Sequence, residues 1–68
     1  MKLSDEAKAV LRKDFTDSLI KFSGGKVSLE EANRIADKKL NYAMFETNDE
    51  YFEKGPEWLA KRIVNGMK

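Results

Sequence analysis

The chain has 68 residues, with no cysteine, no histidine, and 13 Lys and Arg residues against 12 Asp and Glu residues. The missing residue types exclude disulfide bonds, thiolate and histidine catalysis and the usual zinc ligands. Hydrophobic residues make up 41% of the chain, which favours a folded domain over a disordered one. The formal net charge is +1, so the whole molecule has no strong electrostatic attraction to nucleic acid or an anionic membrane. We expect one small domain over residues 1–68, with no cofactor or metal, that acts by contact rather than as an enzyme.

The chain also lacks the marks of export or membrane insertion. Its first residues, Met1 to Glu6, turn acidic where a signal peptide needs an apolar stretch. No run approaches the roughly 18 apolar residues of a membrane span. We therefore expect a cytoplasmic protein. A domain this short buries only about 60% of the surface of its unfolded chain, so a partner or a second copy would add stability.

The first predicted helix covers about 4–22. Ser4 is a suitable N-cap, and Ser23-Gly24-Gly25 follows the last apolar position, where glycine readily closes a helix. Asp14 falls inside the predicted apolar arc, and we expect it at the edge of the core, capping a bend or paired with a basic residue. The predicted apolar face, which omits Thr16 and Ile20, consists of Leu3, Ala7, Val10, Leu11, Phe15, Leu19 and Phe22.

The second predicted helix covers about 28–46. Ser28 and Glu31 have the spacing of a capping box, and Val27 with Ala32 has that of a hydrophobic staple. We expect it to pair tightly and antiparallel with the first helix across the glycine turn, since its apolar stripe is rich in alanine. The stripe consists of Leu29, Ala32, Ile35, Ala36, Leu40, Ala43 and Met44.

A third main helix should begin at Pro56, because proline at the first helical position needs no N–H partner. It should end near Asn65-Gly66. Asn48 and the residues after it suit a short helical turn near 48–54. The sequence thus predicts an all-α compact bundle of three main helices, about 4–22, 28–46 and 56–65, with that short turn as an addition.

Two ligand-binding motifs are rejected because the wrong residue types stand at their required positions. A phosphate loop around Gly24 and Gly25 would need glycine at Ile20, Ser or Thr at Val27, and a preceding strand. A calcium loop from Ile20 to Glu31 would have apolar or glycine residues at its first ligand positions. The first stretch is better explained as a turn between helices, and the second as a capping box that shares the spacing.

Catalysis by carboxylates has equally little support. Asp14 could have a perturbed pKa on an apolar face. However, no second acid has a spacing that specifies an acid–base pair, and a chain of 68 residues leaves little room for an enclosed pocket.

The most uneven segment of the sequence is 42–58. It holds five of the seven aromatic residues and five acids, with Lys54 as its only basic residue. Large rings amid charge are typical of protein-binding surfaces, although a small core also needs rings. The leading hypothesis is a regulatory or accessory module that binds a protein partner or itself. The predicted contact residues are Tyr42, Phe45, Glu50, Tyr51, Glu53 and Trp58.

The alternative is a small helical regulator that binds nucleic acid. Basic and amide side chains recur at helical spacing on the second helix, and the C-terminus is basic; such groups can contact phosphates and base edges. Glu30 and Asp37 lie on or beside the same helical face and would repel phosphates. The residues of this alternative are Arg34, Lys38, Asn41, Lys61 and Arg62.

Overall fold

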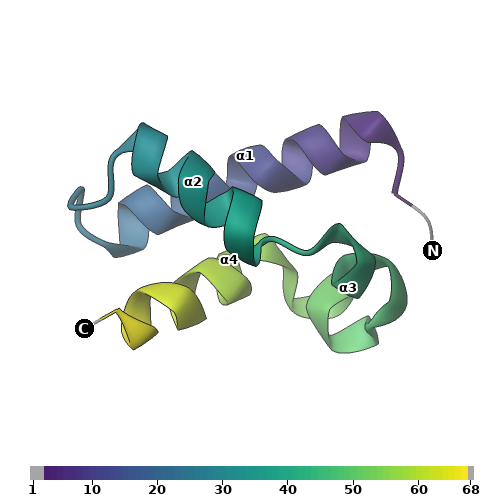
Figure 1. Ribbon diagram of the computed structural model, residues 1–68. Helices are drawn as coiled ribbons and strands as arrows, with labels where there is room; N and C mark the ends of the chain where they lie inside the picture. The colour runs from purple at the N-terminus through teal and green to yellow at the C-terminus, as the bar shows by residue number, and fades with distance from the viewer. Residues whose placement is uncertain (1–2, 68) are drawn as a thin grey trace.

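The computed structural model describes residues 3–67, and these residues form α-helices and no strands. The predicted all-α fold is confirmed. The helices are α1 (Asp5–Phe22), α2 (Leu29–Lys39), α3 (Tyr42–Thr47) and α4 (Asp49–Gly66). In Figure 1, α1 and α2 form one layer, and α3 and α4 lie beneath it. The radius of gyration is 11.4 Å, close to the value of about 11 Å expected for a compact chain of this length.

Helix α1 begins and ends as predicted. The Ser4 hydroxyl oxygen accepts a hydrogen bond of 3.1 Å from the Ala7 N–H and so caps the first turn. After Phe22 the chain turns through Gly24 and Gly25, whose φ angles are +69° and +84°. L-residues with a Cβ adopt this left-handed region at a cost, so the two glycines allow the tight connection to α2.

The buried face of α1 is rotated from the predicted one. Phe15 and Leu19 are fully buried, but Val10 is 61% exposed and the Thr16 side chain is buried. Asp14 is exposed, so its predicted place at the edge of the core is wrong. The physical reason is that α1 packs against two helices, and more extensively against α4 than against α2. The expected pairing with α2 is therefore the smaller of its two contacts.

The second predicted helix is broken into two. Helix α2 ends at Lys39, Leu40 is extended (φ −81°, ψ 106°), and Asn41 caps α3 by accepting a hydrogen bond of 3.0 Å from the Ala43 N–H. The prediction of one helix over 28–46 is wrong in this respect. The break changes which residues face inward, because Leu40 and Phe45 are buried while Ala43 is exposed.

Helix α4 is also interrupted. Gly55 has φ 80° and ψ −178°, so residues 49–54 and 56–66 are two helical segments that meet at a kink. The Asn48 side chain caps the first segment by accepting a hydrogen bond of 2.9 Å from the Glu50 N–H. The predicted short turn near 48–54 and the predicted helix from Pro56 are both present. The second segment ends within one residue of its predicted limit.

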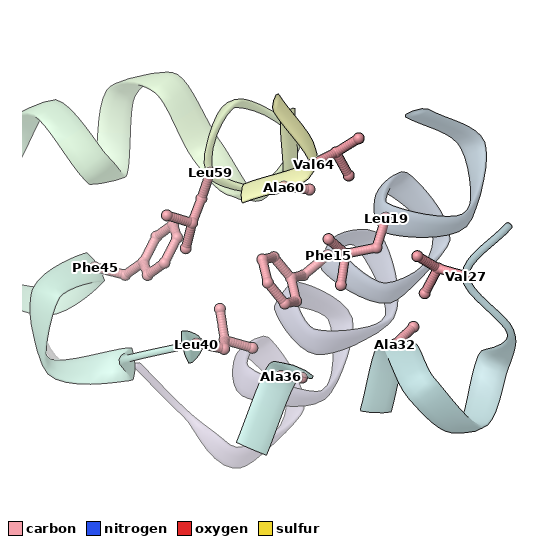
Figure 2. Packing of buried hydrophobic residues seen from close by; sticks show 10 residues of the cluster. All are labelled: Phe15, Leu19, Val27, Ala32, Ala36, Leu40, Phe45, Leu59, Ala60 and Val64. Carbon is pink, nitrogen blue, oxygen red and sulfur yellow. The ribbon is translucent and has the colours of Figure 1, made fainter. Parts of the chain in front are cut away.

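One hydrophobic core joins all four helices. Figure 2 shows the Phe15 ring between α2 and α4, and Leu59 of α4 beside Phe45 of α3. Val27, before α2, is buried as the staple prediction requires. The core consists of Phe15, Leu19, Val27, Ala32, Ala36, Leu40, Phe45, Leu59, Ala60 and Val64. It fixes α3 and the first segment of α4 at one end of the molecule (Figure 1).

Candidate functional site

Three of the predicted contact residues have aromatic rings that pack edge to face in a row. The ring centroids of Phe45 and Tyr51 are 5.5 Å apart at an interplanar angle of 86°, and those of Tyr51 and Trp58 are 5.2 Å apart at 83°. This edge-to-face geometry is favourable for aromatic rings. Phe45 belongs to the core, and Tyr51 and Trp58 pack against it. These rings therefore hold α3 against both segments of α4.

Two cations cover the Trp58 ring. Lys54 Nζ lies 5.3 Å from the ring centroid and the Arg62 guanidinium carbon lies 5.0 Å from it. Both distances fall within the range of a cation–π interaction. Lys54 also pairs with Glu50, at 3.7 Å. Trp58 is therefore half-buried beneath its own helix neighbours rather than presented as an open ring.

The Tyr42 side chain contacts α1 through a cation–π interaction. Lys8 Nζ lies 5.8 Å from the Tyr42 ring centroid. Arg12 forms an ion pair of 2.7 Å with Asp37 and donates a hydrogen bond of 3.1 Å to the Asn33 carbonyl oxygen. The hydrogen bond with Asp37 raises the pKa of Arg12 above its ordinary value, and Tyr42 contributes a smaller effect in the same direction. Because folding raises the pKa of this cation, the charged form of Arg12 stabilises the fold. That stabilisation is fully present below the unfolded-state pKa of arginine and is lost only as the pH rises through the folded-state pKa.

Phe52 differs from the other rings of the segment. It is 55% exposed, whereas its chain neighbour Tyr51 is half-buried. Adjacent residues on a helix point about 100° apart, so only one of the two rings can face the core. The sequence hypothesis placed Tyr51 in its contact set and left Phe52 out. The doublet itself signals that one ring would stay outside, but the burial of Tyr51 depends on the position of Phe45.

A small hollow lies beside Phe52. It has a volume of about 190 Å³ and is lined by Phe45, Glu46, Asn48, Asp49 and Phe52. Glu46 Oε1 accepts a hydrogen bond of 3.2 Å from the Leu3 N–H, which links this region to the start of the chain. The residues that line the hollow thus include two aromatic residues, two acids and one amide.

The two predicted acids, Glu50 and Glu53, and Asp49 before them lie close to this hollow in the sequence. Asp49 and Glu50 occupy the first turn of α4, where negative charge interacts favourably with the helix dipole. Glu53 is exposed one residue after Phe52. We call Phe52, Asp49, Glu53 and the hollow together the Phe52 surface. Of the six predicted contact residues, Glu53 belongs to this surface and Phe45 lines the hollow, whereas Glu50 pairs with Lys54 instead.

The residues of the nucleic-acid alternative are divided between α4 and the α2 to α3 region. Arg34 lies 3.8 Å from Glu30, its partner one turn earlier. Asn41 caps α3, and Arg62 lies over Trp58. Lys38 and Lys61 are exposed. Three of the five side chains therefore have contacts within the molecule.

Two larger hollows lie elsewhere. One, of about 420 Å³, lies between the glycine turn and the end of α4, and is lined mainly by Phe22, Val27, Val64 and Met67 together with Lys26. The other, of about 430 Å³, lies between α1 and α2 around Arg12 and Leu29. Neither is lined by an exposed aromatic residue together with two acids.

Across residues 3–67 there is no group of three or more side chains placed to share a metal ion. Within the same range no helix is both long and apolar enough to cross a membrane. No protein-family model, curated protein or solved structure matches the chain.

Proposed function

We propose that this chain is a protein-interaction module that binds a separate protein through the Phe52 surface and acts as a regulatory or accessory factor. The observation that carries the proposal is the 55% exposure of Phe52 in a segment whose other rings are packed. An exposed aromatic ring loses contact with water when a partner covers it, at little cost in side-chain entropy.

The charges around Phe52 favour a separate partner over a second copy. A symmetric dimer through this face would bring Asp49 and Glu53 of one copy close to the acids of the other copy. Like charges across an interface are unfavourable, whereas a surface with positive charge would be attracted. The partner should therefore be basic where it meets this face.

Binding rather than catalysis also suits the residue types that the chain contains. The chain lacks histidine and cysteine, so its remaining chemistry is suited to recognition by shape and charge. The rings of Phe45, Tyr51 and Trp58 pack edge to face and hold together α3 and α4, the two helices that carry the surface. A rigid support reduces the entropy lost on binding.

The test compares Phe52→Ala with Tyr51→Ala. The immobilised protein is used to select binders from a random-peptide phage library, and each variant is then tested against the selected peptides. We expect Phe52→Ala to remain folded, with a stability change within about 0.5 kcal/mol, and to bind at least about tenfold more weakly, as a contact residue should. Tyr51→Ala should destabilise the fold by about 2–4 kcal/mol, because it removes a ring between two others.

Val10→Ala is the matched control, since Val10 is an apolar residue of similar exposure on another face. It should change neither stability nor peptide binding. Peptides that bind wild type and Phe52→Ala equally well would overturn the proposal. So would salt-sensitive retention of a DNA duplex that is lost with Lys38→Ala or Lys61→Ala, which would favour the nucleic-acid alternative.

A further inference from the structure

We propose that a second copy of this chain binds antiparallel to an exposed face of α1, so that the molecule forms a weak symmetric dimer. The inference goes beyond the proposed function, because this face is separate from the Phe52 surface. Residues at helical spacing form the face on the side of α1 away from the buried Phe15 and Leu19. We call it the α1 face, and it consists of six exposed residues: Glu6, Val10, Lys13, Asp14, Asp17 and Lys21.

The charged side chains of the α1 face are not neutralised within the molecule. Between residues 3 and 67, each ion pair has Arg12, Arg34 or Lys54 as its cation, and none includes a residue of the α1 face. Lys21 Nζ lies 5.8 Å from the ring centroid of Phe22, a contact that leaves its charge uncompensated. The charges of the α1 face are therefore available to a second molecule.

The order of these charges is self-complementary. A symmetric interface pairs residue i of one copy with residue j of the other, and j with i. When the two-fold axis passes between Lys13 and Asp14 of antiparallel α1 helices, Lys13 lies opposite Asp14 of the second copy. Glu6 then lies opposite Lys21, about 11 Å along the helix from the axis at 1.5 Å per residue. Because each pair occurs twice, one register gives four attractive contacts.

Other arrangements of the same face are repulsive. A parallel pair of α1 helices would set each charge against its own copy. Moving one antiparallel copy by one turn in either direction would place Asp17 opposite another acid, either Glu6 or Asp14. Like charges across an interface are unfavourable. The charge pattern therefore selects one orientation and one register.

The selected register also covers exposed apolar side chains. Val10 is 61% exposed, and Leu29 in the first turn of α2 is 59% exposed. Leu29 and Asp17 both line the hollow of about 430 Å³ between α1 and α2. Val10 of the second copy lies opposite Asp17, and so at the edge of this hollow near Leu29. Removing both side chains from water adds a hydrophobic contribution to the charge pairs.

The dimer should be weak and should leave the Phe52 surface open. One helix face buries less than the roughly 800 Å² per partner of a stable complex, so we expect a Kd on the order of 0.1 mM. The chain is then monomeric at the micromolar concentrations of unfolding measurements. Since α3 and α4 form the other layer of the molecule (Figure 1), the dimer presents two copies of the Phe52 surface, which increases avidity for a partner with two sites.

The test is a charge exchange at the two-fold axis, with self-association measured by sedimentation equilibrium up to about 1 mM. Lys13→Glu places an acid opposite Asp14 of the second copy, and Asp14→Lys places a cation opposite Lys13. Each variant alone should associate at least about tenfold more weakly than wild type, because two attractive pairs become repulsive. A mixture of the two variants restores opposite charges at both positions. Titration calorimetry of one variant into the other should therefore return the wild-type affinity.

Lys61→Glu and Glu57→Lys are the matched controls, since both residues are exposed on α4 and the substitutions make the same changes in net charge. Neither control should alter self-association. A wild-type chain that stays monomeric at about 1 mM would overturn the proposal. Equal weakening by the control variants, or a mixture that binds no better than its components, would also overturn it. Circular dichroism checks that every variant is folded.

Discussion

At the scale of single residues, packing gives similar side chains different roles. Leu19 and Val10 both belong to the apolar pattern of α1, yet Leu19 is fully buried and Val10 is 61% exposed. The position of α4 decides between them, because α1 turns its Phe15 and Leu19 side toward that helix. Tyr51 and Phe52 show the same division on α4, where Tyr51 packs against the core and Phe52 stays exposed.

Leu19→Ala should destabilise the fold by about 2–5 kcal/mol, because it removes buried methyl groups and leaves a cavity. A domain of this size rarely has more than about 3–5 kcal/mol in total, so the variant should be largely unfolded at room temperature. Val10→Ala should change stability by less than about 0.5 kcal/mol. Urea unfolding followed by circular dichroism measures both, and similar midpoints for the two variants would contradict the buried position of Leu19.

At the scale of elements, the molecule depends on where its helices stop. Leu40 and Asn41 separate α2 from α3, and Gly55 divides α4. Both breaks change the direction of the chain around the aromatic rings. The first break sets the direction of α3, which carries Phe45, and the second sets the direction of the segment that carries Trp58.

Gly55→Ala should destabilise the fold by about 1–3 kcal/mol, because the φ of 80° and ψ of −178° lie in a region that is essentially restricted to glycine. A Cβ at Gly55 would meet no atom within 4 Å, so the cost is one of backbone conformation alone. Gly66→Ala is the control: Gly66 is helical and equally open, and alanine there should be neutral or slightly stabilising. Thermal unfolding distinguishes them, and equal melting temperatures would show that the kink at Gly55 imposes no strain.

At the scale of the whole molecule, one core serves every helix. Helix α1 contacts both α2 and α4, and α3 joins the same cluster through Phe45 and Leu59. A module of this size has no second core that could remain folded alone. The Phe52 surface should therefore be lost together with the rest of the fold.

Thermal unfolding should show one transition by two probes. Fluorescence of Trp58, the only tryptophan, reports the α3 and α4 region, and far-ultraviolet circular dichroism reports all helices. We expect the same midpoint from both and an unfolding enthalpy of about 50 kcal/mol, as scales with chain length. A Trp58 transition at clearly lower temperature would contradict a single cooperative unit.

The sequence by itself determined the helical class, the capping of the first two helices, the glycine turn and the start of the last segment at Pro56. These features depend on local chemistry: Ser4 and Ser28 accept hydrogen bonds from nearby N–H groups, and glycine or proline restricts the backbone. Such interactions span three or four residues and can be read from the order of the residues. The concentration of aromatic and acidic residues over 42–58 can also be read directly from the sequence.

Only the tertiary structure decided which of those rings remain available. The break after Lys39 was not predicted, because the apolar stripe continues through Leu40 and Met44 and favours one helix. Contacts between distant residues override that local preference by burying Leu40 and Phe45 in the shared core. The same contacts cover Tyr51 and Trp58 and leave Phe52 exposed. Burial depends on how the helices cross, and helical periodicity within one segment carries no information on that crossing.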